Sequence, residues 1–226
     1  MKLQIFSNES LFFQEALQKT LAVIKENLEN KEELHIGLAG GTSPKKLYQA
    51  LARENLPWEK IKFILVDERY VPEDDEESNA QMLRQNLFIP AGVPSQNQML
   101  FNTQLSPIEA CSTMAKKLET LPKPLFDLLI LGAGKDGHIA SLFEGDLNME
   151  STDLAYTTEA PVGYATRQRL TLSLHALTQA SHALLLLKGE GKQELVEALN
   201  GKGILPLTAI KKLMVKVPTE VLACLE

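Results

Sequence analysis

A glycine-rich heptapeptide, Gly132–His138 (GAGKDGH), places an aspartate and a histidine two residues apart, directly after an apolar run. An imidazole, with an unperturbed pKa of about 6.5, can take up and return a proton at neutral pH. A lone histidine is more often structural, but a histidine beside an aspartate in a glycine-rich strand end is a candidate catalytic group. We therefore predict a tight turn that projects Asp136 and His138 into a site.

The same segment matches a dinucleotide-binding pattern, because Gly132, Gly134 and Gly137 spell GxGxxG. That pattern should follow the first strand and open a regular helix. Here it follows a later predicted strand and is closed quickly by Gly145. The Lys-Ser or Lys-Thr pair of a P-loop is missing at the required spacing. These features argue against an NAD site and against a P-loop.

A second segment, Gly40–Lys45 (GGTSPK), carries groups that suit a phosphate. Its two glycines, Gly40 and Gly41, let the backbone approach a ligand closely. The hydroxyls of Thr42 and Ser43 and the N–H groups of a following helix can bind phosphate oxygens. A plain strand-to-helix turn with Ser43 as N-cap explains the segment equally well.

Charged residues follow or flank other apolar runs. Asp67–Glu68–Arg69 comes directly after Ile-Leu-Val, where charges are costly to bury unless they have partners. A solvated loop explains Glu73–Glu77 well but explains Asp67 less well. Near the last predicted strands stand four cations, Arg167, Arg169, Lys188 and Lys192. Such residues usually serve solubility, but two of them facing Thr42–Ser43 would complete a phosphate clamp.

The elements that must position these groups alternate between short apolar runs and amphipathic stretches. The predicted strands are Leu3–Phe6, Leu34–Ala39, Ile61–Val66, Phe126–Leu131, Leu170–Leu174, Ala183–Leu187 and Leu213–Val217. The predicted helices are Ser7–Glu29, Pro44–Arg53, Ser78–Leu87, Pro107–Leu121 and Glu190–Leu199, with an acidic loop at Asp67–Glu77 and a short helix before Ala183. This alternation predicts an α/β fold: a single domain over residues 1–226 with a Rossmann-like, mostly parallel sheet and helices on both faces. Ligands bind such sheets beyond the carboxyl ends of the strands, where the polar groups lie.

The composition is that of an ordinary soluble globule of 226 residues with a net charge of −6. An acidic balance without a long basic run argues against nucleic acid and against an anionic membrane as partner. Cys111 and Cys224 match no metal or redox spacing, and reduced thiols are expected. The N-terminus lacks the apolar core of a signal peptide, and the apolar runs are too short to span a bilayer. We expect a cytoplasmic protein.

Four stretches carry a resemblance to the 6-phosphogluconolactonase family, within the superfamily that it shares with glucosamine-6-phosphate deaminase. They are LAGGTSPKKLYQAL (38–51), FILVDERYVPEDDEESNAQMLRQNL (63–87), FDLLILGAGKDGHIASLF (126–143) and RLTLSLHALTQASHALLLLKGEGK (169–192). They stand in the family's order and spacing over nearly the whole chain. DERYVP followed by SN, together with DGHIASLF, is more specific than any glycine pattern.

The two sister activities differ at particular residues. Deaminases typically carry MDEY where this chain has Val66–Arg69, and FNEPG where it has Ser141–Gly145. Both differences favour the lactonase. The chain departs from the lactonase pattern at Glu144, where SLFPG is usual. Its tail, Lys216–Glu226, lacks the Trp and Asp often found there.

The resemblance implies hydrolysis of 6-phospho-D-glucono-1,5-lactone, the second step of the oxidative pentose phosphate pathway. His138 would act as general base and then general acid, and either Asp136 or Asp67 would orient the imidazole or the water. The phosphate and sugar would be bound by a second set of residues: Gly40, Gly41, Thr42, Ser43, Glu68, Arg69, Gly137, Arg169 and Lys192.

Neither a metal nor a cofactor is expected, because histidines 35, 138, 175 and 182 show no ligand spacing. Ser141 is interpreted as a packing or capping residue, since no GxSxG elbow is present. The expected partner is the small sugar-phosphate lactone alone, and the protein a monomer or small homo-oligomer. Two alternatives stay open: an aminosugar-phosphate isomerase of the deaminase type, and a non-catalytic sugar-phosphate sensor.

Overall fold

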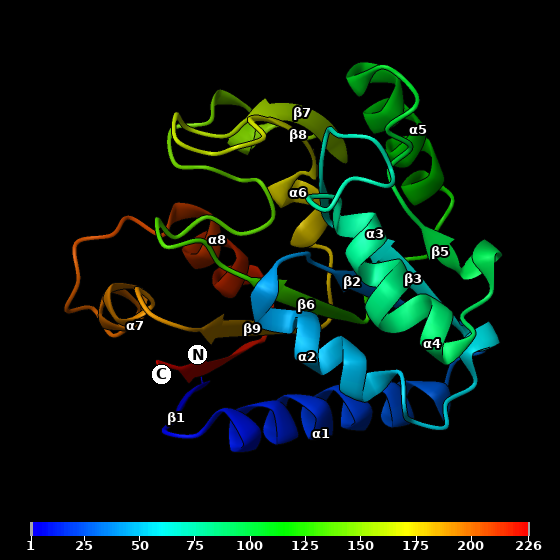
Figure 1. The fold of residues 1–226 in the computed structure, drawn as a ribbon, viewed down its shortest axis with the longest axis horizontal. Coiled ribbons are helices and arrows are strands. Elements are labelled where there is room, and N and C mark those ends of the chain that lie inside the picture. The colour runs from blue at the N-terminus through cyan, green and yellow to red at the C-terminus, as the bar shows by residue number, and fades with distance from the viewer. Residues whose placement is uncertain (1, 226) are drawn as a thin grey trace.

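The computed structural model describes residues 2–225, and within them the central feature is a parallel sheet of seven strands (Figure 1). The strands are β1 (Lys2–Phe6), β2 (Leu34–Leu38), β3 (Ile61–Leu65), β5 (Gln98–Met99), β6 (Leu128–Gly132), β9 (Ala183–Lys188) and β10 (Thr219–Cys224). Their order across the sheet is β1-β10-β9-β6-β2-β3-β5, and every neighbouring pair is parallel. The predicted α/β fold with a mostly parallel sheet is confirmed.

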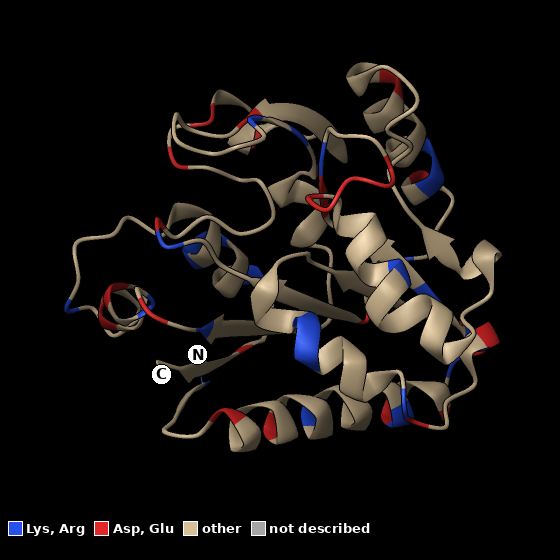
Figure 2. Ribbon diagram, in the orientation of Figure 1, with Lys and Arg blue, Asp and Glu red and all other residues tan. Residues whose placement is uncertain are grey.

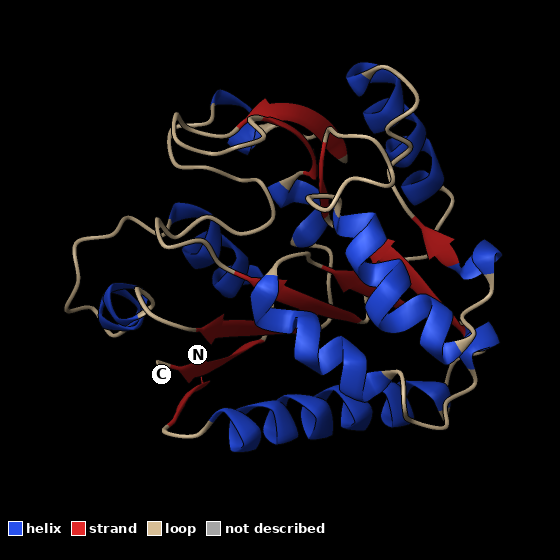
Figure 3. Ribbon diagram, in the orientation of Figure 1, coloured by secondary structure: helices blue, strands red, loops and turns tan. Residues whose placement is uncertain are grey.

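Helices cover both faces of this sheet (Figure 3). On one face lie α1 (Glu9–Leu28) and α2 (Thr42–Leu51), and on the other lie α6 (Leu174–Leu177) and α8 (Thr208–Lys216). The remaining helices are α3 (Asn79–Leu83), α4 (Ile89–Ala91), α5 (Pro107–Glu119) and α7 (Gln193–Leu199). Within residues 2–225, none of the helices combines the length and the apolar character needed to cross a membrane.

Helix α1 illustrates how the sequence pattern sets an element. Its buried residues, Phe12, Ala16, Thr20 and Ile24, recur every four positions and form one stripe toward the sheet. The helix begins at Glu9 rather than at the predicted Ser7, because Asn8 is the N-cap. The Asn8 side chain accepts hydrogen bonds from the backbone N–H of Ser10 (2.7 Å) and Leu11 (3.2 Å).

A smaller antiparallel sheet of three described strands was not predicted. It consists of β4 (Asp67–Arg69), β8 (Gln168–Leu172) and β7 (Ala155–Glu159), in the order β4-β8-β7. The prediction of a loop over Asp67–Glu77 was therefore wrong for its first three residues. Their charged side chains give no strand pattern, and pairing with β8 overrides local propensity. The acidic residues that follow do form a loop, drawn red between β4 and α3 in Figure 2.

The predicted final strand, Leu213–Val217, was also wrong. These residues belong almost entirely to α8, in which Ala209, Ile210 and Leu213 are buried at helical spacing. The last strand is β10, after Pro218, and it lies between β1 and β9. Its apolar residues from Val221 to Cys224 are all buried. The divergent tail is thus an integral strand of the sheet.

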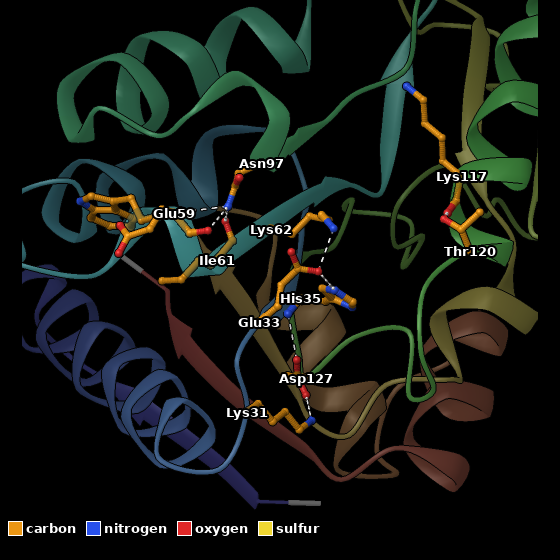
Figure 4. Close-up of polar contacts among 11 residues, drawn as sticks. Lys31, Glu33, His35, Glu59, Ile61, Lys62, Asn97, Lys117, Thr120 and Asp127 are labelled. Carbon is orange, nitrogen blue, oxygen red and sulfur yellow. Dashed lines mark hydrogen bonds and ion pairs between the residues drawn. The ribbon is translucent and has the colours of Figure 1, made fainter.

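A polar network closes the amino-terminal ends of β2 and β3, at the opposite end of the sheet from the segments singled out in the sequence (Figure 4). The Asp127 carboxylate accepts from the Lys31 ammonium and from the backbone N–H of His35 (2.8 Å). The Glu33 carboxylate contacts the His35 ring (2.8 Å) and the Lys62 ammonium (2.8 Å). Because these charges satisfy one another, the network stabilises the fold and offers no free group for chemistry.

Candidate active site

A pocket of about 540 Å³ opens where the chain leaves β2, β3, β6 and β9. Among the predicted site residues, those that line it are Gly40, Gly41, Thr42, Ser43, Asp67, Arg69, His138, Arg169 and Lys192. Asp136, Glu68 and Gly137 do not line it, but Asp136 is hydrogen-bonded to His138, and Glu68 and Gly137 directly precede the lining residues Arg69 and His138 in the chain. The structure therefore brings the groups from four separate sequence segments to one cavity.

Asp136 and His138 form a short hydrogen-bonded pair at this pocket. The Nδ1 atom of His138 donates to Oδ1 of Asp136 at 2.6 Å. Partial burial raises the pKa of Asp136, but the hydrogen bond and the charge of His138 outweigh it and lower the pKa to about 2. Asp136 is therefore an anion over the whole physiological range. With Nδ1 bound to Asp136, Nε2 is the imidazole nitrogen left for a ligand.

The turn that carries this pair depends on Gly137. Its φ of 89° lies in the left-handed region, which favours glycine. A Cβ at this position would also lie 2.5 Å from Cδ2 of Leu207. A glycine is therefore required between Asp136 and His138, and it acts through the backbone rather than by lining the cavity.

The sequence left open whether Asp136 or Asp67 orients the imidazole or the water. In the structure the Asp67 side chain is hydrogen-bonded to Ser141. Asp67 is 6% exposed, and its carboxylate accepts a hydrogen bond from Oγ of Ser141 at 2.7 Å. Its backbone carbonyl accepts from the side-chain amide of Asn79 at 2.8 Å. Asn79 in turn lies against Gly40, where a Cβ would come within 1.9 Å of Oδ1 of Asn79. Asp67 is thus held at the pocket wall by two segments distant in sequence.

Glu68 points away from the pocket and ties β4 to the start of α3. Its carboxylate accepts from the backbone N–H groups of Arg69 (2.7 Å), Asn79 (2.7 Å) and Ala80 (2.8 Å), and from the hydroxyl of Ser78 (3.2 Å). Burial raises the pKa of Glu68 to about 7, although these backbone hydrogen bonds oppose the shift. Ser78 also caps α3, as predicted, by accepting from the N–H of Gln81 at 3.1 Å.

Two arginines stand side by side at the pocket. Arg69 and Arg169 are directly opposite each other in the β4–β8 pair, and both line the cavity. Burial and the neighbouring Arg69 lower the pKa of Arg169, and the side chain's Nε has no hydrogen-bond partner. Like charges placed opposite each other across strands are destabilising. An anionic ligand between or beside them would remove that cost.

The amino-terminal end of α2 supplies the other polar wall. The helix begins at Thr42 with Gly41 as its N-cap, and no side chain caps it. The expectation that Ser43 might be the N-cap was therefore wrong. Because the first N–H groups of a helix have no partner within the helix, they are free to bind an anion.

Lys192 adds to the cationic lining of the pocket, to which Lys135 also contributes, whereas two of the neighbouring cations are paired with carboxylates. Lys192 is buried, with 8% of the residue exposed, and its ammonium donates to the carbonyl of Ala133. Burial lowers its pKa, partly offset by the charge of Asp136. Lys188 also lines the pocket but pairs with Glu9 at 2.8 Å. Arg167 pairs with Glu159 at 2.8 Å and does not line the cavity.

Several features were missed or left undecided by the sequence. Asn79 and Tyr164 line the pocket; Asn79 stands in the SN pair of a recognised stretch, but Tyr164 lies in an irregular loop that gives no signal. Glu144 does not line the pocket, and its Oε1 accepts from the hydroxyl of Thr208 at 2.9 Å. Within residues 2–225, no three His, Cys, Asp or Glu side chains converge as metal ligands would.

The chain is similar to known proteins in both sequence and structure. The family model described as glucosamine-6-phosphate isomerases/6-phosphogluconolactonase matches residues 7–217. The 6-phosphogluconolactonase of Thermotoga maritima is 35% identical over 191 residues, which cover 84% of this chain and 86% of the relative. The 6-phosphogluconolactonase of Synechocystis is 32% identical over 199 residues, covering 85% and 82%. The crystal structure of the Thermotoga maritima enzyme superposes with a TM-score of 0.86 at 30% identity, covering 100% of this chain and 99% of that one.

Proposed function

The chain belongs to the family of glucosamine-6-phosphate isomerases and 6-phosphogluconolactonases, and from that premise we propose how its pocket works. The activity is the hydrolysis of 6-phospho-D-glucono-1,5-lactone to 6-phospho-D-gluconate, the second step of the oxidative pentose phosphate pathway. One observation carries the proposal: an imidazole held by an aspartate at 2.6 Å faces the same cavity as buried, incompletely paired cations. An imidazole of this kind can activate water, and the cations can bind a phosphate ester beside it.

His138 supplies the proton transfers. With Nδ1 donating to Asp136, its Nε2 accepts a proton from water as the oxygen of that water attacks the lactone carbonyl. The tetrahedral intermediate then collapses, the bond from the carbonyl carbon to the ring oxygen breaks, and Nε2 returns the proton to that oxygen. The products are the free 5-hydroxyl and the carboxylic acid, which releases its own proton in solution. Asp136 orients the imidazole and stabilises its cationic form.

Asp67 is left to orient the attacking water. Ser141 donates to Oδ2 of its carboxylate, which leaves Oδ1 without a side-chain donor among residues 2–225, at a residue that lines the cavity. The hydroxyl of Ser141 is committed to Asp67 as a donor, which supports a packing role and not a nucleophilic one.

The substrate's phosphate is bound by the opposite wall. The backbone N–H groups around Gly41–Ser43 at the start of α2, together with Arg169 and Lys192, form the clamp, and Arg69 stands beside Arg169. Gly40 allows the close approach of Asn79, and Glu68 and Gly137 act behind the wall by holding β4, α3 and the catalytic turn. Clamping this remote dianion places the lactone carbonyl at His138, and such positioning can lower a barrier by several kcal/mol.

We also propose the setting in which this activity operates. The chain is a single domain over residues 1–226 that works in the cytoplasm as a monomer or small homo-oligomer, with the lactone as its only expected partner. The net charge of −6 and the buried, unpaired thiols of Cys111 and Cys224 support this assignment.

The direct test is proton release from freshly generated 6-phosphogluconolactone, measured above the spontaneous rate. Acceleration by the purified protein, with no ammonia released from glucosamine-6-phosphate, is the expected result. Ammonia release without lactone hydrolysis would instead make the chain a deaminase. Binding of 6-phosphogluconate without either reaction would make it a sensor, and in both cases the lactonase assignment would be withdrawn.

A further inference from the structure

Tyr164 stands over the catalytic pair from the loop between β7 and β8. We propose that Tyr164 is a positioning residue: its hydroxyl donates to Oδ2 of Asp136 and thereby fixes the carboxylate that orients His138. The inference deepens the proposed lactonase mechanism and rests on it. Position 164 lies outside the four stretches quoted in the sequence analysis, so the sequence motifs did not point to it.

The two oxygens of Asp136 have different partners. Oδ1 accepts from Nδ1 of His138 at 2.6 Å, and Oδ2 accepts from the hydroxyl of Tyr164 at 3.3 Å. The Asp136 side chain is 44% exposed, so packing alone does not immobilise it. The terminal torsion of an aspartate is broad, and a carboxylate held at one oxygen can turn about it. A second anchor at Oδ2 keeps Oδ1 on the imidazole.

The ring of Tyr164 restrains the imidazole as well. The rings of His138, Phe143 and Tyr164 are in mutual contact. The centroids are 4.5 Å apart for His138 and Phe143, 5.9 Å for His138 and Tyr164, and 5.6 Å for Phe143 and Tyr164. On its other side, the guanidinium of Arg169 lies 5.8 Å from the centroid of the Tyr164 ring. Tyr164 therefore stands between the reacting end of the pocket and its cationic end.

The loop that presents Tyr164 is closed by its own hydrogen bonds. The N–H of Ala160 donates to the carbonyl of Arg167 at 2.8 Å, and Nε of Arg167 donates back to the carbonyl of Ala160 at 3.0 Å. The hydroxyl of Thr166 donates to the Glu77 carboxylate and ties the loop to the acidic segment. Burial and the charge of Asp136 raise the pKa of Tyr164, so its hydroxyl keeps the proton that it donates.

The test is Tyr164→Phe, which keeps the ring contacts and removes only the hydroxyl. The expected result is a fall in kcat of about five- to twentyfold, the size of one hydrogen bond to a charged group, with KM changed less than about twofold. The proposal routes the effect through Asp136 and not through the 3.5 Å contact between the Tyr164 hydroxyl and Nδ1 of His138, so Tyr164→Phe made in an Asp136→Asn background should cause no further loss. Tyr156→Phe is the matched control: Tyr156 donates to Oδ2 of Asp146, also at 3.3 Å, away from this pocket, and its loss should leave kcat unchanged.

A wild-type kcat in Tyr164→Phe would overturn the proposal, and so would an equal fold-loss in the Asp136→Asn background. A readout without substrate separates this outcome from failure of the proposed function. The Nδ1–H proton resonance of His138 should be visible in the wild type and broadened by faster exchange in Tyr164→Phe. An unchanged resonance would refute the positioning role, whether or not the wild type hydrolyses the lactone.

Discussion

The hydroxyl of Ser141 donates to the carboxylate of Asp67 at 2.7 Å, although 74 positions separate the two residues. This contact joins β4 to the segment that follows the catalytic turn, and it gives Asp67 a partner other than His138. The two aspartates of the site therefore have different partners, and under the proposed mechanism substitutions at each should have separate effects.

His138→Ala should abolish lactone turnover and leave binding of 6-phosphogluconate largely intact, because the residues of the proposed phosphate clamp lie on other elements. Turnover is measured by proton release and binding by titration calorimetry. His175→Ala, at an exposed position on α6, serves as the control and should be silent in both assays. Retained turnover in His138→Ala would remove His138 from the mechanism.

Asp136→Asn should lower kcat by about a hundredfold or more with little change in KM, because an amide cannot hold the imidazole in the same tautomer or stabilise its cation. Asp67→Asn should also lower kcat, but the Nδ1–H resonance of His138 should persist, since Asp67 does not contact that ring by a hydrogen bond. If the resonance were lost in Asp67→Asn and kept in Asp136→Asn, the two assignments would have to be exchanged.

Arg169→Ala and Lys192→Ala should each raise KM by about tenfold or more, the cost of one charge-assisted hydrogen bond to a phosphate, with a smaller effect on kcat. Steady-state kinetics with the lactone and competition by 6-phosphogluconate measure both constants. The matched control is Arg53→Ala, an exposed arginine just after α2 that does not line the pocket. Equal KM values for Arg53→Ala and Arg169→Ala would take Arg169 out of the clamp.

Glu68→Gln should change the pH dependence of stability. The pKa of Glu68 is raised from 4.5 to about 7 by burial, so the folded state holds a proton that the unfolded chain releases. The stability that this group contributes is fully present below about pH 4.5 and is lost as the pH rises through about 7. Between pH 5 and pH 8.5 the wild type should thus lose on the order of 2 kcal/mol of its free energy of unfolding through this group.

Residue 68 does not titrate in the Gln variant. The amount by which the variant's free energy of unfolding falls below that of the wild type should therefore be larger at pH 5 than at pH 8.5. Urea unfolding followed by circular dichroism at both pH values measures the difference. Glu76→Gln, at an exposed position of the acidic loop, should show the same change in the free energy of unfolding between the two pH values as the wild type. The same change for Glu68→Gln as well would show that Glu68 does not titrate in this range.

The alternation of strands and helices was predictable because the apolar residues of each element follow a pattern typical of a helix or of a strand. The stripe of α1 and the buried run of β9 are visible without knowledge of their neighbours. Strand β4 and helix α8 were mispredicted because their own residue patterns do not identify them. The residues of β4 are charged and become a strand only through pairing with β8, and α8 was mistaken for a strand because its apolar residues are few and closely spaced.

Local features could be predicted from the sequence: the turn that brings Asp136 and His138 close together, and the glycine that permits it. The gathering of polar groups at the carboxyl ends of parallel strands was also predictable, since that edge is common to all of them. That Asp67 pairs with Ser141, that Arg69 faces Arg169 and that Tyr164 contacts Asp136 came from the tertiary structure alone. These contacts join segments tens of residues apart, and their partners depend on strand register and loop path, which no local pattern encodes.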